Sequence, residues 1–180
     1  MNLLAVKKDN CQKAQKALFK LIKIAHEKNI NVLLQEKDFV KGNTEIFKDQ
    51  QVDLGIALGG DGTMLRLSSL IQSYHNTPRV ASFSLGTLGF LLPLSILEKL
   101  ILELEKMQDI IHDMIHDKIK LLNRMRLKCI FKGREFHALN EVVVHRGLNA
   151  HLARLDVFSE NQLLTDVAVL YFFFKNRLMV

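Results

Sequence analysis

The sequence predicts an α/β fold in which an open parallel-sheet amino-terminal domain is followed by the start of an antiparallel all-β domain. Short apolar runs alternate with segments of helical periodicity up to about residue 110, and this alternation is typical of a parallel sheet with right-handed crossovers. Beyond about residue 115 the pattern changes to short strands separated by turn residues. The chain has 180 residues, 48% of them hydrophobic, which suffices for one good core or for one domain and part of another.

The amino-terminal domain is expected to cover residues 1–114. Its first strand is "NLLAV", and the helix in "NCQKAQKALFKLIKIAHEKN" places Ala14, Leu18 and Leu21 at helical spacing. The further strands are "INVLLQE", "VDLGIAL" and "RVASFSL", and the further helices are "TMLRLSSLIQSY" and "LSILEKLILELEKMQ". The alternation of these elements predicts the parallel sheet.

The second domain is expected to cover residues 115–180. Its strands lie in "KIKLLNRMRLKCIF", "GREFHALNEVVVHR" and "HLARLDVFSENQLLTDV", and "KGRE" and "SENQ" are the turns. Only the first strands of such a domain are present, so we expect it to be incomplete. The stretch "HDMIH" before it places His112 and His116 four residues apart without the glutamate of a zinc-protease helix, so we interpret it as a solvated domain junction.

Charge and cysteine content exclude several classes of protein. The formal charge of +6 is spread along the chain without a basic tail or interleaved aromatics, so we expect no nucleic-acid partner. Cys11 and Cys129 form neither a metal-binding pair nor a disulfide framework, which favours a reducing compartment. We expect no membrane partner and a cytoplasmic location, although the lysine-rich amphipathic stretch from Lys7 to Lys23 leaves organelle targeting open.

The stretch "LGIALGGDGTMLR", residues 54–66, carries the chemistry. Glycines at the end of a buried strand let backbone N–H groups approach phosphate oxygens, so Gly59, Gly60 and Gly62 are a candidate phosphate cradle. Thr63 is the expected N-cap of the following helix, whose positive end would add to the site. The stretch lacks the lysine of a Walker loop, so a magnesium ion or basic groups from elsewhere must offset the phosphate charge.

Asp61 is an unexpected residue in a phosphate-binding turn. A carboxylate repels a polyphosphate unless it helps to hold a metal or takes a proton from an incoming hydroxyl, and both roles indicate phosphoryl transfer. The alternative is that Asp61 only caps the turn through its side chain.

Three motifs in order resemble the NAD kinase family. "GGDGT" resembles the signature shared by NAD kinases, diacylglycerol kinases and phosphofructokinases. "SFSLGTLGFL", residues 82–91, and "LNEVVVHRG", residues 139–147, resemble the second glycine motif and the Asn-Glu motif of NAD kinases.

The resemblance implies transfer of the terminal phosphate of ATP to the 2′-hydroxyl of the adenosine ribose of NAD, with a divalent cation such as Mg²⁺. Asp61 would be the catalytic base, and no side chain is assigned as a metal ligand. The implied nucleotide-binding residues are Gly59, Gly60, Gly62, Thr63, Arg66, Phe90, Asn140, Glu141 and His151. Neighbours in a regular strand point to opposite faces, so the backbone must bend if Asn140 and Glu141 are both to reach the ligand. A solvated strand start is the alternative for this pair.

The chain departs from the family after "LLTDV". Family members continue with a Gly-, Ser- and Thr-rich segment, whereas this chain reads "AVLYFFFKNRLMV", and Asp166 is displaced from the position of the family's aspartate. We expect a chain truncated at its carboxyl end, poorly soluble and weakly active or inactive, which would form a homo-oligomer if its second domain were complete. A lipid or sugar-phosphate kinase, or a catalytically dead nucleotide-binding fragment that modulates full-length subunits, remain the alternatives.

Overall fold

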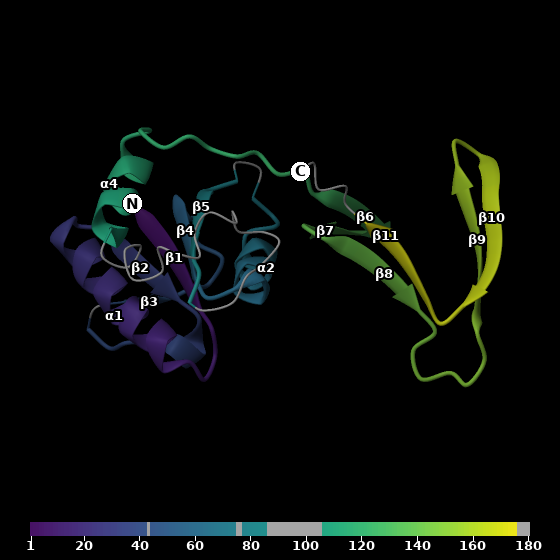
Figure 1. Ribbon diagram of the computed structural model, residues 1–180, viewed down its shortest axis with the longest axis horizontal. Coiled ribbons are helices and arrows are strands. Elements are labelled where there is room, and N and C mark those ends of the chain that lie inside the picture. Colours follow the sequence, from purple (N-terminus) through teal and green to yellow (C-terminus); the bar gives the residue numbers. More distant parts are fainter. Residues whose placement is uncertain (43, 75–76, 86–105, 176–180) are drawn as a thin grey trace. The chain divides into compact units, whose positions relative to one another are not determined.

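The computed structural model describes residues 1–42, 44–74, 77–85 and 106–175. These residues form two compact units, Met1–Leu122 and Asn123–Val180, which are described separately (Figure 1). Phe90 and most of the helix expected in "LSILEKLILELEKMQ" lie outside the described residues.

A five-stranded parallel sheet forms the centre of the first unit. The strand order is β3-β2-β1-β4-β5, and all four pairings are parallel, as the alternation of elements predicted. The strands are β1 (Asn2–Lys7), β2 (Asn31–Leu34), β3 (Glu45–Ile46), β4 (Leu54–Leu58) and β5 (Arg79–Phe83). The edge strand β3 was not predicted, because two residues are too few to show a period.

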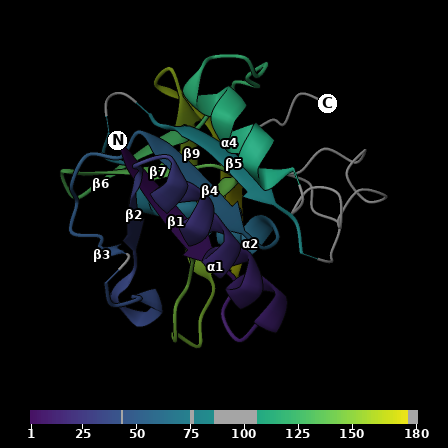
Figure 2. The same cartoon turned by 90° about the vertical axis from the view of Figure 1, so that its left-hand side faces the viewer.

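Helices cover both faces of this sheet. One buried cluster joins Leu3 and Ala5 of β1 to α1 (Gln12–Glu27) and α4 (Met107–Ile115), and Figure 2 shows α1 lying across its face of the sheet. The other cluster joins Leu4 and Val6 to α2 (Asp61–Leu70). Successive side chains of a strand point to opposite faces, so β1 is buried on both, as expected for a parallel sheet.

The residues on either side of His112 are not the solvated junction that we expected. They lie in α4, and Met107, Ile111 and Met114 recur at helical spacing and are buried in the core. His112 itself is half-buried and only His116, just after the helix, is exposed. The interpretation was wrong because it considered only the two histidines, whereas the buried stripe begins before them at Met107 and Ile111.

The strand order reverses between β1 and β4, and this determines where a ligand can bind. β1 is followed by α1 on one face and β4 by α2 on the other, so the two chain segments leave the sheet in opposite directions and open a crevice at the carboxyl ends of both strands. Hydrogen bonds from Lys8 N to Leu58 O (2.9 Å) and from Gly59 N to Phe83 O (3.0 Å) hold the three strand ends together there.

The second unit consists of three antiparallel strand pairs, as predicted for this part of the chain. They are β6 (Leu127–Phe131) with β7 (Arg134–Ala138), β9 (Ala153–Ser159) with β10 (Gln162–Val169), and β8 (Glu141–His145) with β11 (Tyr171–Lys175). The expected turns are confirmed. Lys132 and Gly133 have φ of 50° and 74°, and Glu160 and Asn161 have 49° and 65°, the two positive values that a type I′ hairpin turn requires.

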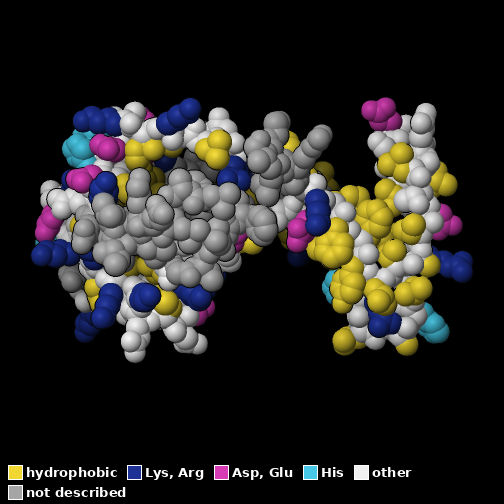
Figure 3. Space-filling view, in the orientation of Figure 1, with side chains coloured by type: hydrophobic (Ala, Val, Ile, Leu, Met, Phe, Trp, Pro, Cys, Tyr) yellow, Lys and Arg dark blue, Asp and Glu magenta, His cyan; other side chains and the backbone are white. Residues whose placement is uncertain are grey.

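The atypical tail forms β11, which pairs with β8 and places Phe173 opposite Val143. Among the described residues of the second unit none is fully buried, and Tyr171 and Phe173 are 60% and 50% exposed. Figure 3 shows hydrophobic side chains gathered on the visible face of this unit. The strand pairs are therefore formed but lack a covering layer among the residues that the structure describes.

Candidate active site

The glycine turn joins β4 to α2 at the crevice. The helix begins at Asp61, and Gly60 takes the N-cap position with extended backbone angles (φ −93°, ψ −165°) and without a side-chain cap. The expected N-cap at Thr63 was therefore wrong. Thr63 is the third helical residue, and its N–H donates to Gly60 O at 2.9 Å, because the extended backbone of Gly60 lets the helix start three residues earlier.

Two glycines of this turn are constrained in different ways. A Cβ on Gly59 would lie 2.2 Å from Thr63 Oγ1 and 3.1 Å from Lys8 Cβ, so internal packing demands glycine there. A Cβ on Gly62 would meet no heavy atom of the described residues within 4 Å, and Gly62 is exposed. The backbone at Gly62 is thus open to an approaching ligand.

Asp61 opens α2 and is half-buried. Because Gly60 takes the N-cap position, the helix does not depend on the Asp61 carboxylate as its N-cap. Asp61 lies in the first turn of α2, where the backbone N–H groups and the positive dipole end favour a negative charge. The turn therefore combines anion-binding backbone with one potential proton acceptor.

A charged bridge that sequence reasoning missed lies at the end of β1. Lys37 Nζ lies 2.7 Å from both carboxylate oxygens of Asp9, and Arg66 Nη1 lies 2.8 Å from Asp9 Oδ2. Arg66 Nη2 also donates to Lys7 O. Hydrogen bonds from Lys37 and then from Arg66 hold the pKa of Asp9 below its usual value. The sequence holds only an indirect signal, the charged runs "KKD" and "EKD" at the ends of two adjacent strands, which does not specify which residues pair.

A second ion pair fixes the segment that carries Lys37. Asp38 ends the short 3₁₀ helix η1 (Glu36–Asp38), its side chain is only 4% exposed, and its Oδ1 lies 2.9 Å from Lys7 Nζ. The other oxygen, Oδ2, is buried without a hydrogen-bond partner among the described residues. This pair ties η1 to the end of β1.

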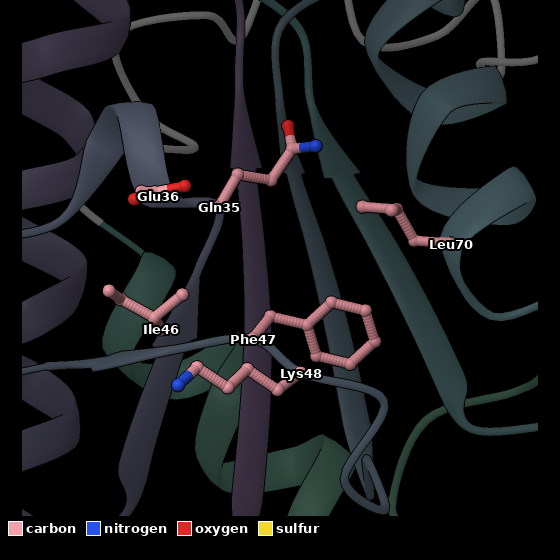
Figure 4. Close-up of a pocket in the computed structure, with 6 residues that line it drawn as sticks. All are labelled: Gln35, Glu36, Ile46, Phe47, Lys48 and Leu70. Atoms are coloured by element: carbon pink, nitrogen blue, oxygen red, sulfur yellow. The ribbon is translucent and has the colours of Figure 1, made fainter.

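A pocket of about 370 Å³ lies in the first unit. Figure 4 shows side chains from the end of β2, from the residues around β3 and from α2 arranged round it. They are Gln35, Glu36, Ile46, Phe47, Lys48 and Leu70. The pocket shares two elements with the bridge, because Glu36 precedes Lys37 in η1 and Leu70 follows Arg66 in α2, but none of the three bridge residues lines it.

The other predicted site residues belong to the second unit. The backbone bends at Leu139 and Asn140, and β8 begins at Glu141, so the bend that this pair needs is present. Asn140 Oδ1 is buried without a hydrogen-bond partner in the described chain, whereas the Glu141 and His151 side chains are exposed. Asp61 and Asn140 thus belong to different units.

His112 in α4 and His116 just after it lie against each other. Their ring centroids are 4.1 Å apart, and His116 Nδ1 lies 2.8 Å from the carbonyl oxygen of His112. Burial, and then the neighbouring His116, lower the pKa of His112. Within the described residues, no three His, Cys, Asp or Glu side chains are grouped to hold a metal ion, and no helix is long and apolar enough to cross a membrane.

Comparison with known proteins gives concordant matches. The profile of the ATP-NAD kinase N-terminal domain matches residues 4–119. The chain is 38% identical over 122 residues to a mitochondrial NADH kinase of Schizosaccharomyces pombe, a match covering 66% of this chain and 29% of that protein. It is 29% identical over 147 residues to a NAD kinase of Clostridium perfringens, covering 79% of this chain and 49% of that protein.

A solved structure shares the fold. The crystal structure of yeast NADH kinase complexed with NADH matches with a TM-score of 0.76 at 28% sequence identity, and the match covers 95% of this chain and 53% of that one. The chain therefore spans less than two thirds of the length of each of these relatives.

Proposed function

Because the chain belongs to the ATP-NAD kinase family, we propose that the protein transfers the terminal phosphate of ATP to the 2′-hydroxyl of the adenosine ribose of NAD, giving NADP. The observation that carries this proposal is the glycine turn at the strand-order reversal, where Gly62 leaves the backbone open and Asp61 stands beside it. Phosphoryl transfer depends on positioning and charge stabilisation, which backbone N–H groups at a helix start can supply.

Asp61 acts as the base in this proposal. Its carboxylate accepts the proton of the ribose 2′-hydroxyl while the hydroxyl oxygen forms a bond to the terminal phosphorus, and the bond to ADP breaks. Gly60 and Gly62 hold phosphate groups through the backbone of the turn. Gly59 and Thr63 shape the turn, because their N–H groups are already bonded to Phe83 O and Gly60 O. The helix start favours the negative charge that develops on the transferred group.

A divalent cation such as Mg²⁺ fits the described residues. The turn has no lysine, so a metal ion or basic groups from elsewhere must offset the phosphate charge, and Mg²⁺ is usually bound by substrate phosphates with only one or two protein carboxylates. When bound it would neutralise phosphate oxygens of the donor. The protein's part is to present the open backbone at Gly62 and the carboxylate of Asp61.

The dinucleotide-binding roles are assigned to the second unit and to the residues before α4. We assign Asn140 and Glu141 to base and ribose hydrogen bonds, and the buried, unpartnered Oδ1 of Asn140 supports its part as an acceptor. His151 is assigned to a further nucleotide contact, and Phe90 to the wall of the site. The two domains, residues 1–114 and 115–180, would contribute the phosphate-binding and dinucleotide-binding parts.

The decisive assay is NADP formation from NAD, ATP and Mg²⁺ by the 180-residue chain, with Asp61→Asn as the control. Loss of a measured activity in Asp61→Asn, with nucleotide binding retained, is the expected result. Activity that survives Asp61→Asn would contradict the assigned base. NADH should be tested in parallel, because several of the relatives are named NADH kinases.

A nucleotide-binding fragment without activity of its own is the second candidate function. The observation in its favour is that none of the described residues of the second unit is fully buried, so this unit lacks a core of its own among them. Co-purification with a full-length homologue, together with no turnover in isolation, would distinguish it. A kinase for another hydroxyl would instead phosphorylate a lipid or sugar phosphate but not NAD.

The cellular location and the oligomeric state of the protein are two further proposals. We propose a cytoplasmic enzyme, although the relative from Schizosaccharomyces pombe is named as mitochondrial, so fractionation must test organelles as well. We also propose a homo-oligomer formed through the second domain when that domain is complete. Sedimentation of a chain extended to the length of its relatives tests this.

A further inference from the structure

Two cations from separate elements converge on one carboxylate at the crevice. Lys37 comes from η1 after β2, and Arg66 comes from α2 after β4, yet both contact Asp9 in the turn after β1, at 2.7 Å and 2.8 Å. An ammonium and a guanidinium held this close around two oxygens would also suit a phosphate group. The two carboxylate oxygens of Asp9 thus lie where two oxygens of a phosphate group could bind the same cations.

The place of this bridge in the fold suits a phosphate ligand. It lies at the carboxyl ends of β1 and β2, beside the strand-order reversal, and α1 begins just beyond it at Gln12. The N-terminus of α1 has no side-chain cap and no acidic residue in its first turn, so its free N–H groups face no competing carboxylate from the helix itself.

The two cations are held in place independently of Asp9. Arg66 Nη2 donates to Lys7 O, and Arg66 Nε is buried without a hydrogen-bond partner among the described residues. The pair between Lys7 and the buried Asp38 fixes η1 and thereby the residue next to it, Lys37. Without the Asp9 charge, Arg66 therefore keeps its bond to Lys7 O, and Lys37 stays on an anchored segment.

Asp9 is held weakly by comparison. Its side chain is 49% exposed and that of Lys37 is 47% exposed, and exposed ion pairs contribute only about 0–1 kcal/mol each. A polyphosphate carries several charges and can bind a guanidinium through two oxygens, so it competes well against a single exposed carboxylate.

We propose that Lys37 and Arg66 form a phosphate-binding pair for the polyphosphate tail of the phosphoryl donor, and that Asp9 occupies this pair until the donor phosphates displace it. The inference deepens the proposed kinase function and rests on it for the identity of the ligand. Asp9 is then a residue that sets the affinity for the donor by competing with it, and does not touch the transferred group.

The test is equilibrium dialysis of labelled inorganic tripolyphosphate against the full 180-residue chain and three variants. Asp9→Asn keeps the shape of the side chain and removes its charge, and is expected to bind tripolyphosphate about fivefold more tightly, the equivalent of one exposed ion pair. Lys37→Met is expected to bind at least about fivefold more weakly on the same basis. Glu36→Gln is the matched control. It also removes one negative charge, at the residue next to Lys37 in the chain, but Glu36 is not the carboxylate that pairs with Lys37.

Each outcome decides the proposal. Tighter binding by Asp9→Asn with little change in Glu36→Gln supports it. Unchanged or weaker binding by Asp9→Asn would show that Asp9 only positions Arg66, and an equal gain in Glu36→Gln would reduce the effect to general electrostatics; either result overturns the proposal. Circular dichroism on each variant, together with Asp9→Ala as a second charge-removing change, separates a binding effect from misfolding.

The kinase function can fail separately. If the variants bind tripolyphosphate as expected but NADP does not form from NAD and ATP in a chain that binds both nucleotides, the phosphate-binding pair stands and the proposed reaction is wrong. If Asp61→Asn abolishes NADP formation but neither Asp9→Asn nor Lys37→Met changes tripolyphosphate binding, the reaction stands and the pair is wrong.

Discussion

Gly59 and Thr63 pack against each other so closely that a Cβ on Gly59 would lie 2.2 Å from Thr63 Oγ1. Thr63 is buried, and Gly59 is the first residue after β4. This contact fixes the angle at which α2 leaves the sheet, and hence where Asp61 stands at the crevice. The glycine turn therefore allows close packing between β4 and α2, in addition to being a candidate phosphate-binding turn.

Gly59→Ala is expected to destabilise the fold. The added methyl group overlaps a buried hydroxyl in a tightly packed turn, and overpacking of this kind costs about 1–3 kcal/mol. Urea unfolding followed by circular dichroism would measure the loss. An unchanged midpoint would mean that α2 can shift without cost, which would weaken the case for a fixed turn.

Gly62→Ala is expected to behave in the opposite way. No heavy atom of the described residues would contact the new methyl group and the backbone is helical, so the free energy of unfolding should stay the same or rise by up to about 1 kcal/mol. Nucleotide binding should weaken, because the methyl group occupies the open side of the turn. A variant that binds ATP like the parent chain would show that phosphate does not approach at Gly62.

The ion pairs of Asp9 with Lys37 and Arg66 make the free energy of unfolding depend on pH in the acid range. Lys37 and Arg66 lower the pKa of Asp9 in the folded chain, so the folded state favours the carboxylate more than the unfolded chain does. The bridge's contribution is therefore present above the unfolded pKa, about 3.9, and is lost as the pH falls through the lower folded value.

Comparing the parent chain with Asp9→Asn across the acid range tests this dependence. The parent should unfold at higher urea concentration near neutral pH, and the difference should shrink as Asp9 becomes protonated. A difference that is constant down to pH values well below the unfolded pKa would mean that the contacts with Lys37 and Arg66 do not persist in solution.

Local patterns predicted most of the fold, whereas contacts between distant residues were invisible to them. The hairpin turns were predictable because Gly133 and Asn161, between alternating strands, are residue types that accept positive φ. The Asp9–Lys37 contact joins residues 28 positions apart, and nothing in either local sequence specifies the pairing. Only the parallel register of β1 and β2, which brings both strand ends to one edge, places them together.

The same contrast holds within the candidate site. The glycines and Asp61 were recognisable because they form one continuous motif after a buried strand. The N-cap was assigned to the wrong residue, because threonine is a common cap and the extended backbone at Gly60 has no signature in composition. Local preference thus located the turn, and tertiary packing decided its geometry.

The last prediction concerns the aromatic strand β11. Tyr171 and Phe173 lie on one face with ring centroids 6.3 Å apart and are 60% and 50% exposed, whereas Phe172, on the other face, is half-buried. Exposed aromatic strands promote association between chains, so Tyr171→Thr with Phe173→Thr should raise solubility while keeping strand propensity. Static light scattering at increasing concentration measures this.

Phe172→Thr is the matched control for that pair. It changes the same strand on its less exposed face, so it should leave association unchanged or increase it by weakening the contact with Phe174, whose ring centroid lies 5.0 Å away. If Phe172→Thr reduces scattering as much as the double variant, the exposed face of β11 is not the surface through which chains associate. The hairpins β6–β7 and β9–β10, with Phe136 and Phe158 exposed, would then be the next surfaces to alter.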